Sequence, residues 1–126
     1  MKLRRLPAWT DARRRVAARY REVLSGLPLA LPVERPEVHH VYNQFTVRAA
    51  ERDALVRRLA AHGVGTAVHY PLPIPGQPLF EKAGARGGDC PRAWQAAREV
   101  ASLPCYPELT DAEIEAVGRA VRQVLA

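Results

Sequence analysis

The sequence predicts an α+β domain, in which helices cover one face of a small sheet. Two observations support this fold class. Long segments carry apolar residues at the three- and four-residue steps of a helix face, and two shorter segments have the composition of strands. The chain has 126 residues, of which 48% are hydrophobic, so it can bury a core of its own. We therefore expect residues 1–126 to form one domain.

The first predicted helix covers about residues 7–25. Its apolar residues recur every three or four positions, and arginines lie on the opposite face. Gly26 and Pro28 follow and end the helix. So long an apolar face must pack against another element, and in an isolated domain part of it would stay exposed. Its members are Leu3, Leu6, Trp9, Val16, Tyr20, Val23 and Leu27.

The middle of the chain predicts a strand, a helix and a second strand joined by short loops. A proline-rich connector over residues 27–38 leads into a strand at 39–47, whose alternating faces include β-branched and aromatic residues. A helix at 52–62 comes next, and Gly63 suits the left-handed position after its end. Residues 64–70 form the second predicted strand.

The segment after this strand contains four prolines within residues 71–78, which exclude a helix or an inner strand there. We expect a stiff surface loop, followed by a short helix over 78–83. Asp89 is a suitable N-cap for another helix, which should continue to about residue 101. An extended piece over 102–107 should follow it.

Thr110 and Glu113 have the spacing of a capping box, which opens the last predicted helix. Loss of such a cap costs about 1 kcal/mol of stability. The inward face of this helix should consist of Ile114, Val117, Val121, Val124 and Leu125.

The net charge is +6, and arginine supplies most of the positive charge. The arginines are scattered instead of forming a basic stripe with interleaved aromatic residues, so solvated helix faces explain them better than a nucleic-acid site. No apolar run has the length of a membrane span, and no apolar segment follows the basic start, so we expect a cytoplasmic protein without a signal peptide. Cys90 and Cys105 lack metal-site spacing and are expected to be reduced thiols.

His69 and Tyr70 form the strongest candidate site, because they lie where a predicted strand meets the rigid proline loop. Polar groups on a stiff loop are positioned at a small entropic cost, which favours ligand contact. The alternative is structural: His69 covers the edge of the sheet, and Tyr70 packs its ring with the hydroxyl in water.

The sequence gives no support for a metal site or for other common catalytic motifs. His39 and His40 are adjacent, so in a strand their side chains point to opposite faces. No pair of histidines has ligand spacing, and neither the serines nor the glycines lie in a nucleophile motif or a phosphate loop. The possible metal ligands considered were His39, His40, His62, His69 and Cys105.

Four stretches resemble the C-terminal part of the DegT/DnrJ/EryC1/StrS aminotransferase family, in the family's order and spacing. The segments GVGTAVHYP, with a following QP, and LPCYPELTDAEIE are the most specific. The resemblance covers nearly the whole chain. The stretches are LRRLPAWTDARRRVAARYREVLSGL, HHVYNQFTVR, RDALVRRLAAHGVGTAVHYPLPIPGQPLF and SLPCYPELTDAEIEAV.

This resemblance implies the small domain of a fold-type-I enzyme that depends on pyridoxal phosphate, with a mainly antiparallel sheet covered by helices. Such enzymes transfer an amino group, usually from glutamate, to a keto sugar linked to a nucleotide, in amino-sugar and polysaccharide biosynthesis. They work as homodimers. The resemblance further implies that residues 1–27 are the linking helix that would follow a large domain, which carries the lysine that forms the Schiff base.

The family motif, transferred residue by residue, makes His69 and Tyr70 substrate-binding residues, because they match the HYP motif that faces the active site. Asn43 lies in the first predicted strand, where many members have a histidine, and Pro75 lies where the loop often carries one. The resemblance implies no catalytic residue here, because neither Lys2 nor Lys82 lies in the family's lysine motif. We expect the chain alone to bind no pyridoxal phosphate and to be inactive.

A stand-alone interaction module, which pairs with a separate aminotransferase large domain, is the alternative function. The unusually apolar first helix motivates it, because a face of this kind could serve a partner. Nucleic-acid binding would rest on the net charge alone.

Overall fold

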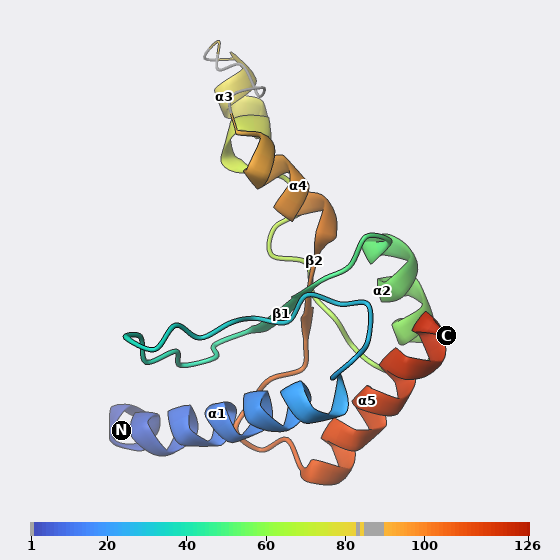
Figure 1. The fold of residues 1–126 in the computed structure, drawn as a ribbon. Helices are drawn as coiled ribbons and strands as arrows, with labels where there is room; N and C mark the ends of the chain where they lie inside the picture. The colour runs from blue at the N-terminus through green and yellow to red at the C-terminus, as the bar shows by residue number, and fades with distance from the viewer. Residues whose placement is uncertain (1, 83, 85–89) are drawn as a thin grey trace.

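The computed structural model describes residues 2–82, 84 and 90–126, which fold into helices around a small antiparallel sheet (Figure 1). The prediction of an α+β domain is confirmed. In chain order the elements are η1 (Lys2–Arg5), α1 (Leu6–Val23), β1 (Phe45–Arg48), α2 (Arg52–Ala61), η2 (Ile74–Gly76), α3 (Pro78–Lys82), α4 (Pro91–Glu99), β2 (Val100–Leu103) and α5 (Asp111–Leu125).

The sheet consists of β1 and β2, which pair antiparallel with Phe45 opposite Leu103. A single bridge extends it on each side: Ala30 pairs with Arg48, and Ala67 pairs with Ser102. Both bridges have reciprocal backbone hydrogen bonds between 2.7 and 3.1 Å long. Four segments of the chain therefore lie next to one another in the order Ala30, β1, β2, Ala67.

The first strand is shorter than the predicted 39–47. It begins only at Phe45, because Tyr42 has a φ of 45° and so leaves the extended region. The Tyr42 backbone N–H instead donates to Nδ1 of His40, 2.9 Å away. The alternating pattern of residues 39–47 does not reveal this turn, so the predicted strand was too long.

The predicted strand at 64–70 is wrong as a continuous strand, because only Ala67 forms a bridge. The antiparallel register would next place residue 65 opposite Pro104, which has no N–H to donate. In the other direction it would place residue 69 opposite Val100. The Val100 carbonyl already accepts a hydrogen bond from Nη1 of Arg52, at 2.9 Å.

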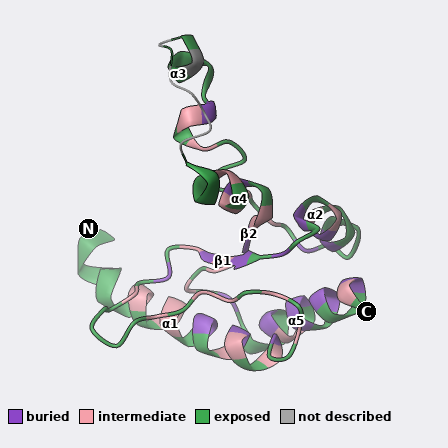
Figure 2. Ribbon diagram, turned by 45° about the horizontal axis from the view of Figure 1, so that its top comes forward, coloured by how far each residue is buried: buried purple, intermediate pink, exposed green. Residues whose placement is uncertain are grey.

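Helices α1 and α5 lie side by side on one side of the sheet, with their buried faces toward it (Figure 2). Along η1 and α1 the predicted apolar face is buried only in its second half. Val16 and Tyr20 are fully buried, whereas Leu3 and Leu6 are 69% and 47% exposed. The expectation that part of this face would be exposed is confirmed.

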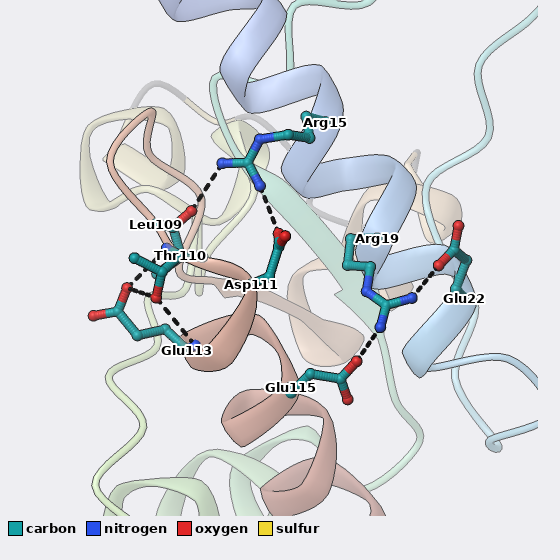
Figure 3. A network of polar contacts seen from close by, with 8 residues as sticks. All are labelled: Arg15, Arg19, Glu22, Leu109, Thr110, Asp111, Glu113 and Glu115. Atoms are coloured by element: carbon teal, nitrogen blue, oxygen red, sulfur yellow. Dashed lines mark hydrogen bonds and ion pairs between the residues drawn. The ribbon is translucent and has the colours of Figure 1, made fainter.

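Polar contacts fix α5 against α1 (Figure 3). The predicted capping box is present: the Thr110 hydroxyl accepts from the Glu113 backbone N–H, and the Glu113 carboxylate accepts from the Thr110 backbone N–H. Arg15 of α1 bonds Asp111 at 2.7 Å, and Arg19 pairs with Glu115. Of the predicted inward face, Leu125 is partly buried, and the buried members are Ile114, Val117, Val121 and Val124.

Helix α2 matches its prediction closely, and Gly63 takes the expected left-handed conformation with a φ of 75°. Helix α4 ends at Glu99 instead of about residue 101, because Val100 already pairs with β1. Cys90 holds the position before α4 and its side chain makes no capping bond. The predicted N-cap Asp89 lies outside the described residues.

The core lies between the sheet and the helices α1, α2 and α5. Tyr20 and Phe45 are in ring contact at its centre, with centroids 5.0 Å apart. The Tyr20 hydroxyl donates to the carbonyl oxygen of Pro104 at 2.9 Å, and burial raises the pKa of this phenol. The largest fully buried side chains are Tyr20, Tyr42, Phe45, Leu24, Leu59, Ile114, Val16, Val47 and Val121.

Candidate functional site

The segment between Ala67 and β2 leaves the sheet and projects away from the layer of α1 and α5 (Figure 1). It contains η2, α3 and α4, so the predicted surface loop after Tyr70 includes one helical turn. The predicted short helix α3 is present as Pro78–Lys82. This segment carries the candidate site that the sequence indicates.

His69 is exposed at the base of this segment, where the chain leaves the sheet. Its Nδ1 atom lies 3.5 Å from Oγ of Ser102 in β2. Ser102 is buried, with 6% of its surface exposed, and its Oγ lies 2.9 Å from Oγ1 of Thr46 in β1. The imidazole therefore lies next to the Ser102 hydroxyl, which in turn contacts the Thr46 hydroxyl of the neighbouring strand.

Tyr70 is 72% exposed, and its ring meets the His69 ring edge to face with centroids 5.6 Å apart. The structure thus brings the two predicted residues together and leaves the phenol accessible. An exposed hydroxyl next to an exposed imidazole can donate hydrogen bonds to, and accept them from, a polar ligand.

A groove of about 540 Å³ begins at His69 and Tyr70 and runs between the proline segment and α4. Gly76 in η2 is buried, and the Trp94 ring of α4 packs directly on it, which joins the proline segment to α4. Most of the lining is apolar, and the lining residues are His69, Tyr70, Leu72, Pro73, Ile74, Pro75, Cys90, Ala93, Ala96, Ala97 and Val100.

Asn43, the third predicted site residue, is exposed just before β1 and does not line this groove. Pro75, by contrast, is a lining residue. Sequence reasoning missed Thr46 and Ser102. They are the hydroxyl residues of β1 and β2, and the sequence does not reveal that the sheet register pairs them.

A second groove, of about 820 Å³, lies between α1 and residues 31–39. The Arg14 guanidinium bonds Glu34 at 2.6 Å, and Glu34 also accepts from the His40 backbone N–H and the Tyr42 hydroxyl. These bonds lower the pKa of the Glu34 carboxyl to about 2, and the bond from Arg14 has the largest effect. Arg21 donates to the Tyr42 hydroxyl and lies over the Tyr42 ring. This network ties the connector to α1.

The two lysines of the chain do not fit the need of pyridoxal phosphate for an enclosed amine. Lys2 lies in η1 and Lys82 ends α3, and both are exposed. Figure 1 shows these two elements in separate parts of the molecule. Neither lysine therefore provides an enclosed amine in the part of the chain that the structure describes.

The side chains considered as metal ligands do not gather within the described ranges, where no three His, Cys, Asp or Glu groups form a metal-sized cluster. Cys90 and Cys105 are both free thiols. Among the helices of residues 2–82 and 90–126, none combines the length and the hydrophobicity that crossing a bilayer requires.

Several known proteins with a similar sequence are sugar aminotransferases. An enzyme of Acidithiobacillus ferrooxidans, UDP-N-acetyl-3-dehydro-alpha-D-glucosamine 3-aminotransferase, is 40% identical over 95% of this chain and 32% of its own length. The dTDP-3-amino-3,4,6-trideoxy-alpha-D-glucose transaminase of Streptomyces venezuelae is 39% identical over 98% of this chain and 33% of its own length.

The fold is also found in a solved enzyme. The crystal structure of DesV from S. venezuelae, in complex with a ketimine intermediate, superposes with a TM-score of 0.92 and 39% identity. The match covers 97% of this chain and 33% of DesV. The chain thus spans about a third of the length of the curated relatives it matches.

The sequence resemblance is confirmed by a family model that matches residues 1–122, nearly the whole chain. This extent, together with the superposition on DesV, shows that the chain belongs to the DegT/DnrJ/EryC1/StrS aminotransferase family.

Proposed function

We propose that this chain acts as the small C-terminal domain of an aminotransferase that depends on pyridoxal phosphate and acts on nucleotide-linked keto sugars. One observation carries the proposal: similarity extends over nearly all of this chain but over only a third of each relative. In this proposal a large domain supplies the other two thirds, and residues 1–27 form the linking helix. The enzyme works in the cytoplasm as a homodimer, with glutamate as amino donor.

The cofactor supplies the electron sink of the reaction, and in this proposal the large domain holds it. The present chain contributes substrate contacts. His69 and Tyr70 offer hydrogen-bonding groups to a sugar hydroxyl or a diphosphate oxygen, and the groove beside them offers apolar side chains to the rest of the ligand. Asn43 offers a further amide near the start of β1. The chain alone is inactive, because Lys2 and Lys82 are exposed and lie outside the groove.

The proposal is tested by joining the 126-residue chain to the large domain of the S. venezuelae transaminase, in place of that enzyme's own matching third. Mass spectrometry then measures the aminated sugar formed from glutamate, pyridoxal phosphate and the keto sugar of that enzyme. We expect product from the hybrid and none from the chain alone. The His69→Ala hybrid should need a higher substrate concentration.

Two results would contradict the proposal. The first is turnover by the chain alone that disappears in the Lys82→Ala variant, since this would place the catalytic amine here. The second is a hybrid that folds and binds the cofactor but gives no product with any nucleotide-linked keto sugar offered.

A stand-alone module that pairs with a separate large domain remains the second candidate. It is favoured by exposed apolar side chains on the projecting segment: Leu79 is 73%, Tyr70 72% and Ile74 68% exposed. Light scattering distinguishes the two hypotheses. A module should form a stable complex with a separately expressed large domain, whereas a domain of one longer chain should stay unpaired.

A further inference from the structure

Ser102 is buried in the middle of β2, although its side chain carries a hydroxyl. Its backbone N–H and carbonyl both pair with Ala67, at 2.7 and 3.1 Å. Its neighbours Ala101 and Leu103 are also buried. A buried hydroxyl costs stability unless it is hydrogen-bonded, so the contacts of this side chain explain why a serine is tolerated here.

Three neighbouring segments of the sheet meet at this hydroxyl. Thr46 stands opposite Ser102 in the register of β1 and β2, and the two oxygens are 2.9 Å apart. His69 follows two residues after Ala67, where the chain bends, and its Nδ1 lies 3.5 Å from Oγ of Ser102. Thr46, Ser102 and His69 therefore form a row across the sheet.

We propose that Ser102 is a positioning residue for His69, and that Thr46 in turn holds the Ser102 hydroxyl. The inference rests on the proposed function, in which His69 contacts the substrate. Ser102 itself is too buried to do so.

The physical effect is to fix the orientation of the imidazole. A hydroxyl can satisfy only one side of the ring, so the contact at Nδ1 leaves Nε2 for the ligand. The Ser102 hydroxyl can donate to Nδ1 or accept from Nδ1–H, so it holds the ring in either tautomer. Without Ser102, the exposed His69 ring would populate other rotamers.

The first test measures the ring of His69 in the 126-residue chain by nitrogen-15 NMR, because the chemical shift of Nδ1 responds to its hydrogen-bond partner. The His69→Gln variant assigns the signals among the four histidines. In the Ser102→Ala variant we expect the Nδ1 shift to move, because water replaces the Ser102 hydroxyl as the partner of this nitrogen. Ser102→Thr, which keeps the hydroxyl, should restore it.

Ser25 provides a matched control, because it is the other serine of the chain and is exposed after α1. Ser25→Ala should leave the His69 shifts unchanged, and Thr46→Val should change them in the direction of Ser102→Ala. Circular dichroism confirms that each variant is folded. Unchanged His69 shifts in a folded Ser102→Ala chain would overturn the inference.

The second test measures steady-state kinetics in the hybrid enzyme described above. Loss of one oriented hydrogen bond should raise the KM for the keto sugar about fivefold in Ser102→Ala, with kcat little changed. If Ser102→Ala changes the His69 shifts while KM stays constant in both Ser102→Ala and His69→Ala, the substrate role of His69 fails and the positioning contact stands. If KM rises in His69→Ala alone, the positioning role fails.

Discussion

Substituting Gly118 by alanine tests how closely α5 packs on α1. Gly118 is buried in α5, and a Cβ added to it would lie 2.9 Å from Cγ2 and 3.1 Å from Cβ of Val23. Contacts under 3.0 Å force a displacement. The Val23 Cβ is bonded to the backbone of α1, so a change of rotamer cannot move it away.

Two opposing effects decide the sign of the change. Glycine inside a helix is less favourable than alanine by about 1 kcal/mol, which favours the substitution. Adding a methyl group to a tightly packed contact costs roughly 1–3 kcal/mol. We expect the second effect to prevail, with Gly118→Ala lowering the free energy of unfolding by about 1 kcal/mol and Tm by about 4 °C.

Thermal unfolding followed by circular dichroism measures the effect. Gly65→Ala is the matched control, because Gly65 is exposed and an added Cβ would meet nothing within 4 Å. This control should keep or slightly raise Tm. In a Val23→Ala background the cost of Gly118→Ala should shrink, since Cγ2 is gone. A Gly118→Ala chain that is more stable by the full helix-propensity gain would refute the close packing.

Three further predictions follow from single contacts. Gly76→Ala should destabilise the projecting segment by roughly 1–3 kcal/mol and shift tryptophan fluorescence to the red, because its Cβ would lie 2.5 Å from Cη2 of Trp94. Glu34→Gln should be less stable than wild type at pH 7, and urea unfolding should show this difference vanish as pH falls from 4.5 toward about 2, since the folded carboxyl has the lower pKa. Iodoacetamide at pH 8, followed by mass spectrometry, should label the exposed Cys90 far faster than Cys105, whose pKa burial raises to about 11; equal rates would contradict this.

The helices could be predicted from the sequence because their signals are local. The period of the apolar residues defined α1 and α5, the Thr110 capping box marked the start of α5, and Gly63 marked the end of α2. Each of these signals depends on residues within one or two turns of the chain. Tertiary packing then preserved what the local sequence favoured.

The strands were predicted less well because pairing partners are distant in sequence. Residues 64–70 have strand composition, but Pro104 lies opposite residue 65 and cannot continue the ladder. Val100 was predicted at the end of a helix and instead starts β2, since β1 pairs with it. Neither constraint is visible within a short window of sequence.

The candidate site shows the same difference between local signals in the sequence and contacts made through distant pairing. His69 and Tyr70 were predicted because a strand-like segment meets a proline loop, and the structure brings the two rings together. Thr46 and Ser102 were missed, because only the sheet register places them beneath His69. The predicted substrate contact of Asn43 stays a prediction.

The projecting segment leaves the sheet after Ala67 and re-enters it shortly before Ser102, and these two residues face each other across a hydrogen-bonded pair. The hydrogen bonds between Ala67 and Ser102 thus hold the two ends of the segment together. Closing a longer loop costs only about 0.6 kcal/mol for each doubling of its length. Insertions and deletions between Ala67 and Ser102 should therefore cost little stability. The length and composition of the projecting segment can then vary while the core stays unchanged.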